Sequence, residues 1–335
     1  MSASVRASNA TDRDGVLDTG DRPWSDAAAA TLSQLAATVR KRSKKVRDHV
    51  DQDGVHDLRT ATRRLRTALK VYGDDAASSD RKRVEKTLRQ IARRLGAVRD
   101  LDVLLEALAR ASDEGTRPSR AAQIDANDLA PLRRAWQDER QANARRLAAD
   151  LDRGRYRHAV HDAEHLLARG SGSSPSSAPS GAVVERIAVR APGLIWEAAG
   201  RVFAYELDPM TADPDLIHQL RIAAKKLRYT LEAFEDALAP GPSLVERVTA
   251  LQDAAGQFHD AVVARDRARV FARRRAVSDR QKRAIRSFSR LQDDRAADSR
   301  TTVAHRLAEV RSRRFRNALG RAVAGMGHTN GSRLG

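Results

Sequence analysis

VHDLRTATRRLRTALKVY, residues 55–72, is the stretch that decides the fold, because the chain carries it twice. The second copy is IHQLRIAAKKLRYTLEAF at residues 217–234, which aligns without a gap at a shift of 162 residues (218 − 56, from His56 to His218). In both copies apolar residues recur at three- and four-residue steps, the period of one face of an α-helix. The sequence therefore predicts two matching amphipathic helices. Asp213-Pro214 is a typical start for the second, and Asp53 is predicted to cap the first.

Weaker similarity extends the repeat beyond these two helices. LGAVRDLDVLL at 95–105 lies over AGQFHDAVVAR at 255–265, and RGRYRHAV around Tyr156 resembles RSRRFRNAL around Phe315. Between the halves, GSGSSPSSAPSG at 170–181 has the composition of a flexible linker. Chance similarity of Ala- and Arg-rich helices could produce part of this resemblance between the halves. It would not place the His-x-x-Arg motif and the leucines at the same positions in both, so we infer a duplicated helical unit.

The predicted fold class is all-α, a helical bundle built from two internal repeats related by a pseudo-twofold axis. No sustained strand alternation is found, and aromatic residues make up only 4% of the chain. The halves form one intertwined domain or two adjacent lobes. The expected organisation is a disordered N-terminal lead at 1–23, helical repeat 1 at 24–169, the linker at 170–181, helical repeat 2 at 182–327, and a flexible tail at 328–335.

The charge balance points to a polyanionic partner. Among the 335 residues, 62 Lys and Arg stand against 44 Asp and Glu, which gives a net charge of +18. Such a surplus favours nucleic acid, a phosphate polymer or an anionic membrane. The absence of cysteine excludes disulfides and thiolate sites. No apolar run approaches the ~20 residues that span a bilayer, and no signal peptide is evident, so a soluble cytoplasmic protein is expected.

The two matching helices are expected to carry the binding site. On a helical wheel, one face of each copy is basic and the leucines lie opposite. The basic faces consist of His56, Arg59, Arg63, Arg66 and Lys70 in the first copy and His218, Arg221, Lys225 and Arg228 in the second. A single row of this kind would be a solvated face. Two rows facing each other through a pseudo-twofold axis would form a basic trough for an extended anion.

The paired pattern His-x-x-Arg-x-x-x-[Arg/Lys]-[Arg/Lys]-Leu-Arg, at 56–66 and 218–228, resembles the CHAD family of histidine-containing α-helical domains. The Leu-Gly-x-x-Arg-Asp-x-Asp-Val segment at 95–103 is also typical of that family, and the resemblance covers roughly residues 24–325. It implies a helical, internally duplicated fold that binds inorganic polyphosphate through its basic helices. One departure is His259, which stands at the position of Arg99 and is interpreted as tolerated variation.

Several neighbouring groups are assigned weaker roles. A further basic stripe, comprising Lys82, Lys86, Arg89 and Arg93, would extend the trough or face water. Asp100 and Asp260 are expected to brace the arginines. The two motif histidines either donate to phosphate or pack on their neighbours. Surrounding arginines should lower their pKa in the empty protein, and a bound anion should raise it, which predicts tighter binding at mildly acidic pH.

A metal site and catalysis are both weighed and set aside. His158, His161 and His165 follow one helix face, but Glu164 is placed off that face, so a solvated stripe is favoured over a metal site. The chain lacks GxxxxGK[ST], GxSxG and HExxH motifs, and the basic faces carry no carboxylate that could hold a catalytic metal beside phosphate. We therefore expect no enzyme activity, no metal and no cofactor.

The expected function is polyphosphate binding, as a module that targets the protein to polyphosphate or organises it. It is expected to be cytoplasmic and could associate with polyphosphate granules. The alternative is non-specific binding of the nucleic-acid backbone, for which the same charges would serve. Single-strand binders usually add aromatic platforms, and Tyr72 and Phe234 are predicted to lie on the buried side of their helices. A third reading, a metal-dependent phosphohydrolase, would use the histidine stripe.

Overall fold

The computed structural model describes residues 21–72, 78–114, 124–166, 185–238, 244–274 and 276–327. The first half contains α1 (Trp24–Asp48), α2 (Gln52–Tyr72), α3 (Ser78–Glu114), α4 (Ala130–Asp152) and α5 (Gly154–His165). The second half contains α6 (Ile187–Phe203), α7 (Pro214–Ala233), α8 (Leu244–Arg274), α9 (Asp279–Arg311) and α10 (Arg313–Ala324), with short 3₁₀ turns at Glu235–Ala237 and Gly325–Gly327. In this part of the chain the only β-type pairing is an isolated bridge between Pro23 and Arg186, so the all-α prediction is confirmed.

The two sequence-matched helices are α2 and α7, and their leucine faces are buried as predicted. Leu58, Leu65, Leu69 and Tyr72 on α2 and Leu220, Leu227, Leu231 and Phe234 at α7 are at most 2% exposed. The start of α7 is also as predicted, because the Asp213 side chain accepts a hydrogen bond from the amide of Asp215. The predicted cap of α2 is wrong. That helix begins at Gln52, and Asp51 rather than Asp53 accepts from the Gly54 amide.

An aromatic cluster joins the two halves at one end of the molecule. The Trp24 ring of α1 lies 4.7 Å from Tyr72 and 6.0 Å from Phe234, and the latter two are 6.0 Å apart, centroid to centroid. Tyr72 and Phe234 occupy the same place in the two sequence copies. Burying three aromatic side chains against one another stabilises both the core and the junction of α2 with α7.

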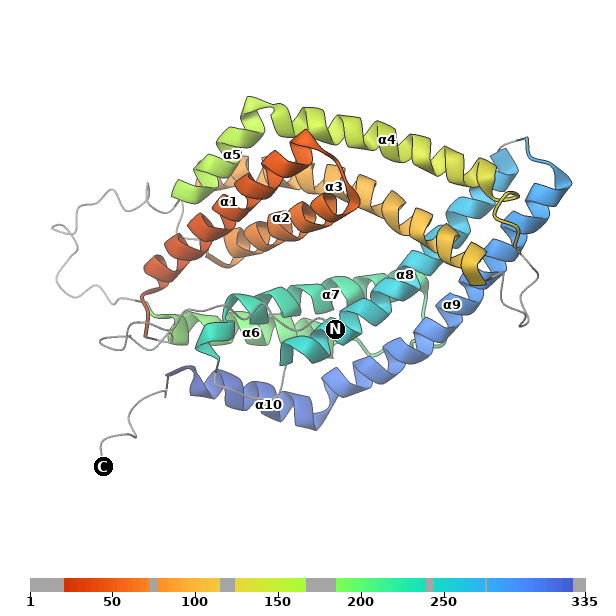
Figure 1. Cartoon of the computed structure of the whole chain (residues 1–335). Helices are drawn as coiled ribbons and strands as arrows, with labels where there is room; N and C mark the ends of the chain where they lie inside the picture. Colours follow the sequence, from red (N-terminus) through yellow and green to blue (C-terminus); the bar gives the residue numbers. More distant parts are fainter. Residues whose placement is uncertain are drawn as a thin grey trace, which may run out of the picture.

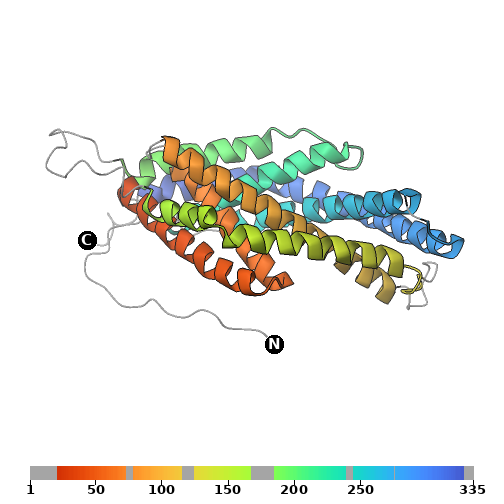
Figure 2. The ribbon, with the colours of Figure 1, turned by 90° about the horizontal axis from the view of Figure 1, so that it is seen from above.

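A second apolar cluster joins the halves at the opposite end. There α3 and α8 run past the trough-bearing helices, and their far portions pack with α4 and α9 (Figure 1). The cluster centres on Trp136 and Phe288, whose rings meet edge to face at 6.3 Å. Because the halves are fastened at both ends, α2 and α7 face each other across the middle of an elongated molecule (Figures 1 and 2).

The predicted duplication stays a prediction, although the helix order is compatible with it. Each half has five α-helices among the described residues, and α4/α5 and α9/α10 both break just before a buried aromatic, Tyr156 or Phe315. Residues 1–20, the linker at 170–181 and the tail at 328–335 lie outside the described residues. No helix within the described ranges is long and apolar enough to cross a membrane.

Candidate anion-binding trough

The basic faces of α2 and α7 converge on Lys225, the central cation of the trough. Burial lowers the pKa of Lys225 to about 8, together with the charges of four surrounding arginines. These arginines are Arg221 on the same helix and Arg63, Arg59 and Arg66 on α2. The structure therefore brings residues from both predicted rows into one cluster, across a sequence separation of about 160 residues. Like charges held this close repel one another, so the empty trough is electrostatically strained.

Tyr229 is a trough residue that the basic pattern did not identify. Its ring contacts two guanidinium groups, 4.7 Å from that of Arg63 and 4.6 Å from that of Arg228, and Arg228 Nη2 donates to the tyrosine hydroxyl at 2.7 Å. Burial, with Arg59 and Arg228 adding to it, lowers the pKa of Arg63 to about 10. The tyrosine therefore forms a cation–π contact with one arginine from each helix. The first copy has Thr67 at this position, so the two halves differ here.

Several trough donors are buried without a hydrogen-bond partner. They are Nε of Arg63, Nε of Arg221, Nε of Arg228 and Nδ1 of His218. Of these, Arg228 has a carboxylate nearby, since its Nε lies 3.5 Å from an oxygen of Glu232. A buried donor without a partner costs about 1–3 kcal/mol, and more when the group is charged. The empty cluster is therefore destabilised by unpaired polar atoms as well as by charge repulsion.

At the end next to Tyr72 and Phe234, the two walls of the trough carry different charges. In the first copy, Arg66 and Lys70 lie near Arg89 of α3, and burial followed by charge repulsion lowers the pKa of both. The residue that matches Lys70 in the second copy is Glu232, which lies 3.8 Å from Arg64 and 3.5 Å from Arg228. The α2 wall therefore carries a cation at this end, whereas the α7 wall carries a carboxylate that pairs with an arginine from each helix.

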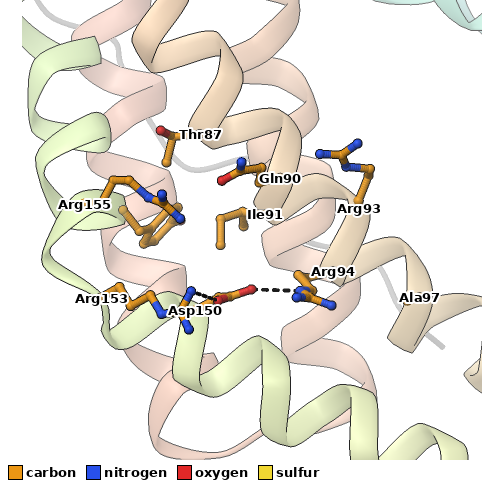
Figure 3. Close-up of a pocket in the computed structure, with 10 residues that line it drawn as sticks. Thr87, Gln90, Ile91, Arg93, Arg94, Ala97, Asp150, Arg153 and Arg155 are labelled. Carbon is orange, nitrogen blue, oxygen red and sulfur yellow. Dashed lines mark hydrogen bonds and ion pairs between the residues drawn. The ribbon is translucent and has the colours of Figure 1, made fainter.

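The predicted extension along α3 divides into separate parts. Lys82, Lys86, Arg89 and Arg93 are all exposed. The positive charge of Arg89 contributes to the lowered pKa of Arg66 and of Lys70, so Arg89 lies next to the trough. Arg93 instead lines a pocket of about 450 Å³ between α3, α4 and α5, where Arg94 and Arg153 both pair with Asp150 at 2.8 and 2.9 Å (Figure 3).

The two motif histidines have different surroundings. His218 packs against His259, with ring centroids 4.5 Å apart, whereas His56 is exposed. Burial, then Arg221 and Lys225, lowers the pKa of His218, and burial together with His218 lowers the pKa of His259 to about 4. Arg99, at the position of His259 in the first copy, pairs with Glu106 at 2.9 Å. His259 is therefore a packing partner of His218, which the interpretation as tolerated variation overlooked.

Two carboxylates from other helices approach the trough, and they are the two that were expected to brace its arginines. Asp100 of α3 and Asp260 of α8 both interact electrostatically with Arg59 and Arg221. Burial raises the pKa of each carboxyl, and for Asp260 the charge of Asp100 raises it further. Helices α3 and α8, which pack against α2 and α7, supply these groups.

The histidine stripe on α5 also differs from its prediction. His161 and His165 share a cluster with Glu164, and the possible metal-binding atoms of the three lie within 4.8 Å of one another. The placement of Glu164 off that face is therefore wrong, because residues three and four apart are neighbours on a helix. His158 is not part of the cluster. The cluster is on α5, away from the α2 and α7 faces that form the trough (Figure 1).

Comparisons with known proteins agree on the fold. A family model described as CHAD domain matches residues 29–269. The crystal structure of the CHAD domain from the plant Ricinus communis superposes with a TM-score of 0.68 and 23% identity, over 90% of this chain and 97% of that one. A structure named PptA, from Streptomyces chartreusis, gives a TM-score of 0.62 and 19% identity, over 85% of this chain and 99% of that one. Among curated proteins, none matches.

Proposed function

The chain belongs to the CHAD domain family, and we propose that it binds inorganic polyphosphate in the trough between α2 and α7 without breaking it down. The observation that carries the proposal is the convergence of arginines from both helices on Lys225. A protein gains nothing in stability from such a cluster, so a ligand that neutralises it is the simplest physical reason for its presence. The family resemblance points to the same ligand.

The trough is suited to a polymer with a charge on every unit. From Arg59 to Lys70 the basic row of α2 rises about 16 Å, at ~1.5 Å per residue. Arginine forks bind phosphate oxygens in pairs. An extended anion of several linked phosphates would contact both walls along this length. A single phosphate would leave most of the cations unneutralised.

Nucleic acid is the second candidate, and the aromatic residues of the trough argue against its single-stranded form. Tyr72 and Phe234 are buried in the junction cluster, and the Tyr229 ring is covered by two guanidinium groups. None of these three rings is available as a platform on which a base could stack. Duplex DNA, bound through its backbone alone, is the form that a binding experiment must compare with polyphosphate.

A non-catalytic role is part of the proposal. Asp100 and Asp260 are the carboxylates that could hold a metal beside phosphate, and each is surrounded by arginines that compete for it. Their proximity to Arg59 and Arg221 fits the bracing role expected from the sequence. Incubation of polyphosphate with the protein and Mg²⁺ or Mn²⁺ should release no inorganic phosphate above the rate without protein.

The decisive experiment is a titration of the protein with long-chain polyphosphate, pyrophosphate and duplex DNA at 50 and 200 mM salt. Binding through 6–10 phosphates should weaken by about 10³–10⁵ between these conditions. We expect polyphosphate to bind more tightly than DNA at the higher salt, and pyrophosphate to bind weakly throughout. Equal affinities for DNA and polyphosphate at 200 mM salt would contradict a dedicated trough.

The affinity for polyphosphate should fall as the pH rises from 8 to 10. In the empty trough Lys225 has a pKa of about 8, and a bound anion raises it. Binding therefore takes up a proton between the two values, and the affinity falls by at most about tenfold per pH unit there. Isothermal titration at constant ionic strength would measure the profile. Lys225→Arg should move the fall in affinity to higher pH, because an arginine keeps its charge to a higher pH than a lysine in the same place.

The same reasoning applies to His218 on the acid side. Its pKa is lowered in the empty protein, so a bound anion that restores the charge should tighten binding as the pH falls below 7. His218→Gln should remove this increase in affinity, whereas the fall in affinity above pH 8 should remain. An affinity that does not change between pH 7 and 5.5 would show that His218 packs without contacting the ligand.

Replacing Gly256 with leucine should weaken polyphosphate binding by about 10–100-fold. Gly256 is buried on α8, and a Cβ there would lie 3.4 Å from Arg221 Nε, so a larger side chain must displace that arginine. One charge-assisted hydrogen bond is worth about 1.5–3 kcal/mol, which sets the expected loss. The matched control is Gly96→Leu on α3, where nothing lies within 4 Å of the added Cβ and binding should be unchanged.

A further inference from the structure

Helix α5 presents a group of side chains that polyphosphate binding does not use. His161, Glu164 and His165 belong to the segment HDAEH at 161–165, and their donor atoms lie within 4.8 Å of one another. The two imidazole rings meet at 4.6 Å between centroids, edge to face. Among the described residues this is the one group of three or more metal-ligating side chains that lie so close together.

The chemistry of the three donors selects a class of cation. Two imidazole nitrogens and one carboxylate oxygen suit zinc and its neighbours, whereas Mg²⁺ and Ca²⁺ prefer oxygen ligands. Two histidines four residues apart on one helix already form a bidentate site, and Glu164 is adjacent to both. In a tetrahedral site with bonds of about 2.0–2.1 Å, the donors would have to approach to about 3.3 Å. Side-chain rotation at the surface of a single helix can supply this movement.

The surroundings hold α5 and Glu164 in place. Arg40 of α1 donates to the Glu164 carboxylate at 2.5 Å, and the Tyr156 hydroxyl is hydrogen-bonded to Ser43 of α1 at 2.7 Å. The side chain of Glu164 is only 16% exposed, so its position is well defined. Arg40 engages one carboxylate oxygen and leaves the other for a cation. The positive charge of Arg40 also repels a metal ion bound at Glu164. Replacing Arg40 therefore tests whether Glu164 is a ligand.

We propose that His161, Glu164 and His165 form a surface site for a divalent transition-metal ion of the zinc class. Water or an anion oxygen would complete the coordination. The site is on α5 and does not depend on the proposed function of the trough. His158 lies on the same helix, three residues before His161, but is outside the group, and this provides an internal control.

The test is isothermal titration of the full chain with ZnCl₂ at pH 7.5 in a buffer without phosphate. We expect one saturable ion at this site, and at least a tenfold loss of affinity in His161→Ala and in His165→Ala. His158→Ala should bind as the unchanged protein does. Arg40→Gln should bind several-fold more tightly, because a competing cation is removed. Cobalt(II) absorption spectra would report the nitrogen ligands directly.

The His218–His259 pair in the trough could bind a second ion, so the stoichiometry is compared between variants. His259→Ala should retain the α5 ion, and the double variant His161→Ala/His165→Ala should lose it. Circular dichroism should show that these surface variants are folded. An equal loss of affinity in His158→Ala, or a double variant that keeps all zinc binding, would overturn the proposal. An Arg40→Gln variant with unchanged affinity would remove Glu164 from the ligand set.

Discussion

Replacing Lys225 with glutamate should greatly weaken polyphosphate binding and at the same time stabilise the empty protein. Lys225 is repelled by four arginines, and burial and these charges together bring its pKa to about 8. A carboxylate at this position would instead attract the same arginines. The substitution turns a strained cluster into a neutralised one and places a negative charge where the ligand would lie.

The loss of affinity can be given an approximate size. The loss of one charge-assisted contact costs about 1.5–3 kcal/mol, and repulsion of the ligand by the new carboxylate adds to it. We therefore expect the affinity to fall by at least about 10²–10³-fold, since 1.4 kcal/mol corresponds to tenfold. The melting temperature without ligand should rise, because the four arginines that repel a lysine would attract a carboxylate. Titration and thermal unfolding at low salt would measure the two quantities.

The control for this substitution is Lys44→Glu, an equal change of charge at an exposed position of α1. It should leave stability almost unchanged and weaken binding only as far as net charge does. A destabilised Lys225→Glu protein would show that the cations are not mutually repelling in the empty state. A Lys225→Glu protein that still binds polyphosphate would place the ligand elsewhere.

Periodicity was sufficient to predict α2 and α7, because their leucine faces are regular and deeply buried. It could also place Arg59, Arg63, Lys225 and their neighbours on one face, since a helical wheel depends only on spacing. The convergence of the two rows required the further assumption of a pseudo-twofold relation. The structure brings the rows together without that assumption, through the apolar junctions at both ends of the molecule.

What the sequence missed lies between helices rather than along one. Tyr229 has an unremarkable place in its own helix, and only the approach of α2 puts Arg63 over its ring. Asp100 and Asp260 were expected to brace arginines, but the packing of α3 and α8 decides that Arg59 and Arg221 are the arginines they meet. Glu164 is a different case. Its spacing from His161 and His165 was visible in the sequence and was misjudged.

The double substitution Arg59→Ala and Arg221→Ala should weaken polyphosphate binding by about 10²–10⁴-fold. The two arginines hold matching positions in the repeat, and both approach the same pair of carboxylates, so they lie on opposite walls of one site. Two charge-assisted contacts are worth about 3–6 kcal/mol together, which gives the expected range. The slope of log affinity against log salt should also fall by about two, one for each phosphate contact removed.

The matched control is the double substitution Arg64→Ala and Lys226→Ala. It also removes one cation from each helix, again at matching positions of the repeat. These two are exposed and pair with Glu232 at 3.8 Å and Glu197 at 3.2 Å, so the same loss of charge should cost less than tenfold in affinity. The single variants distinguish binding between the two helices from binding to one basic helix alone. If the polymer contacts both walls, Arg59→Ala and Arg221→Ala should each weaken binding, and the losses should approximately add. If one of them has no effect, the ligand binds a single helix and the facing arrangement of α2 and α7 has no part in recognition.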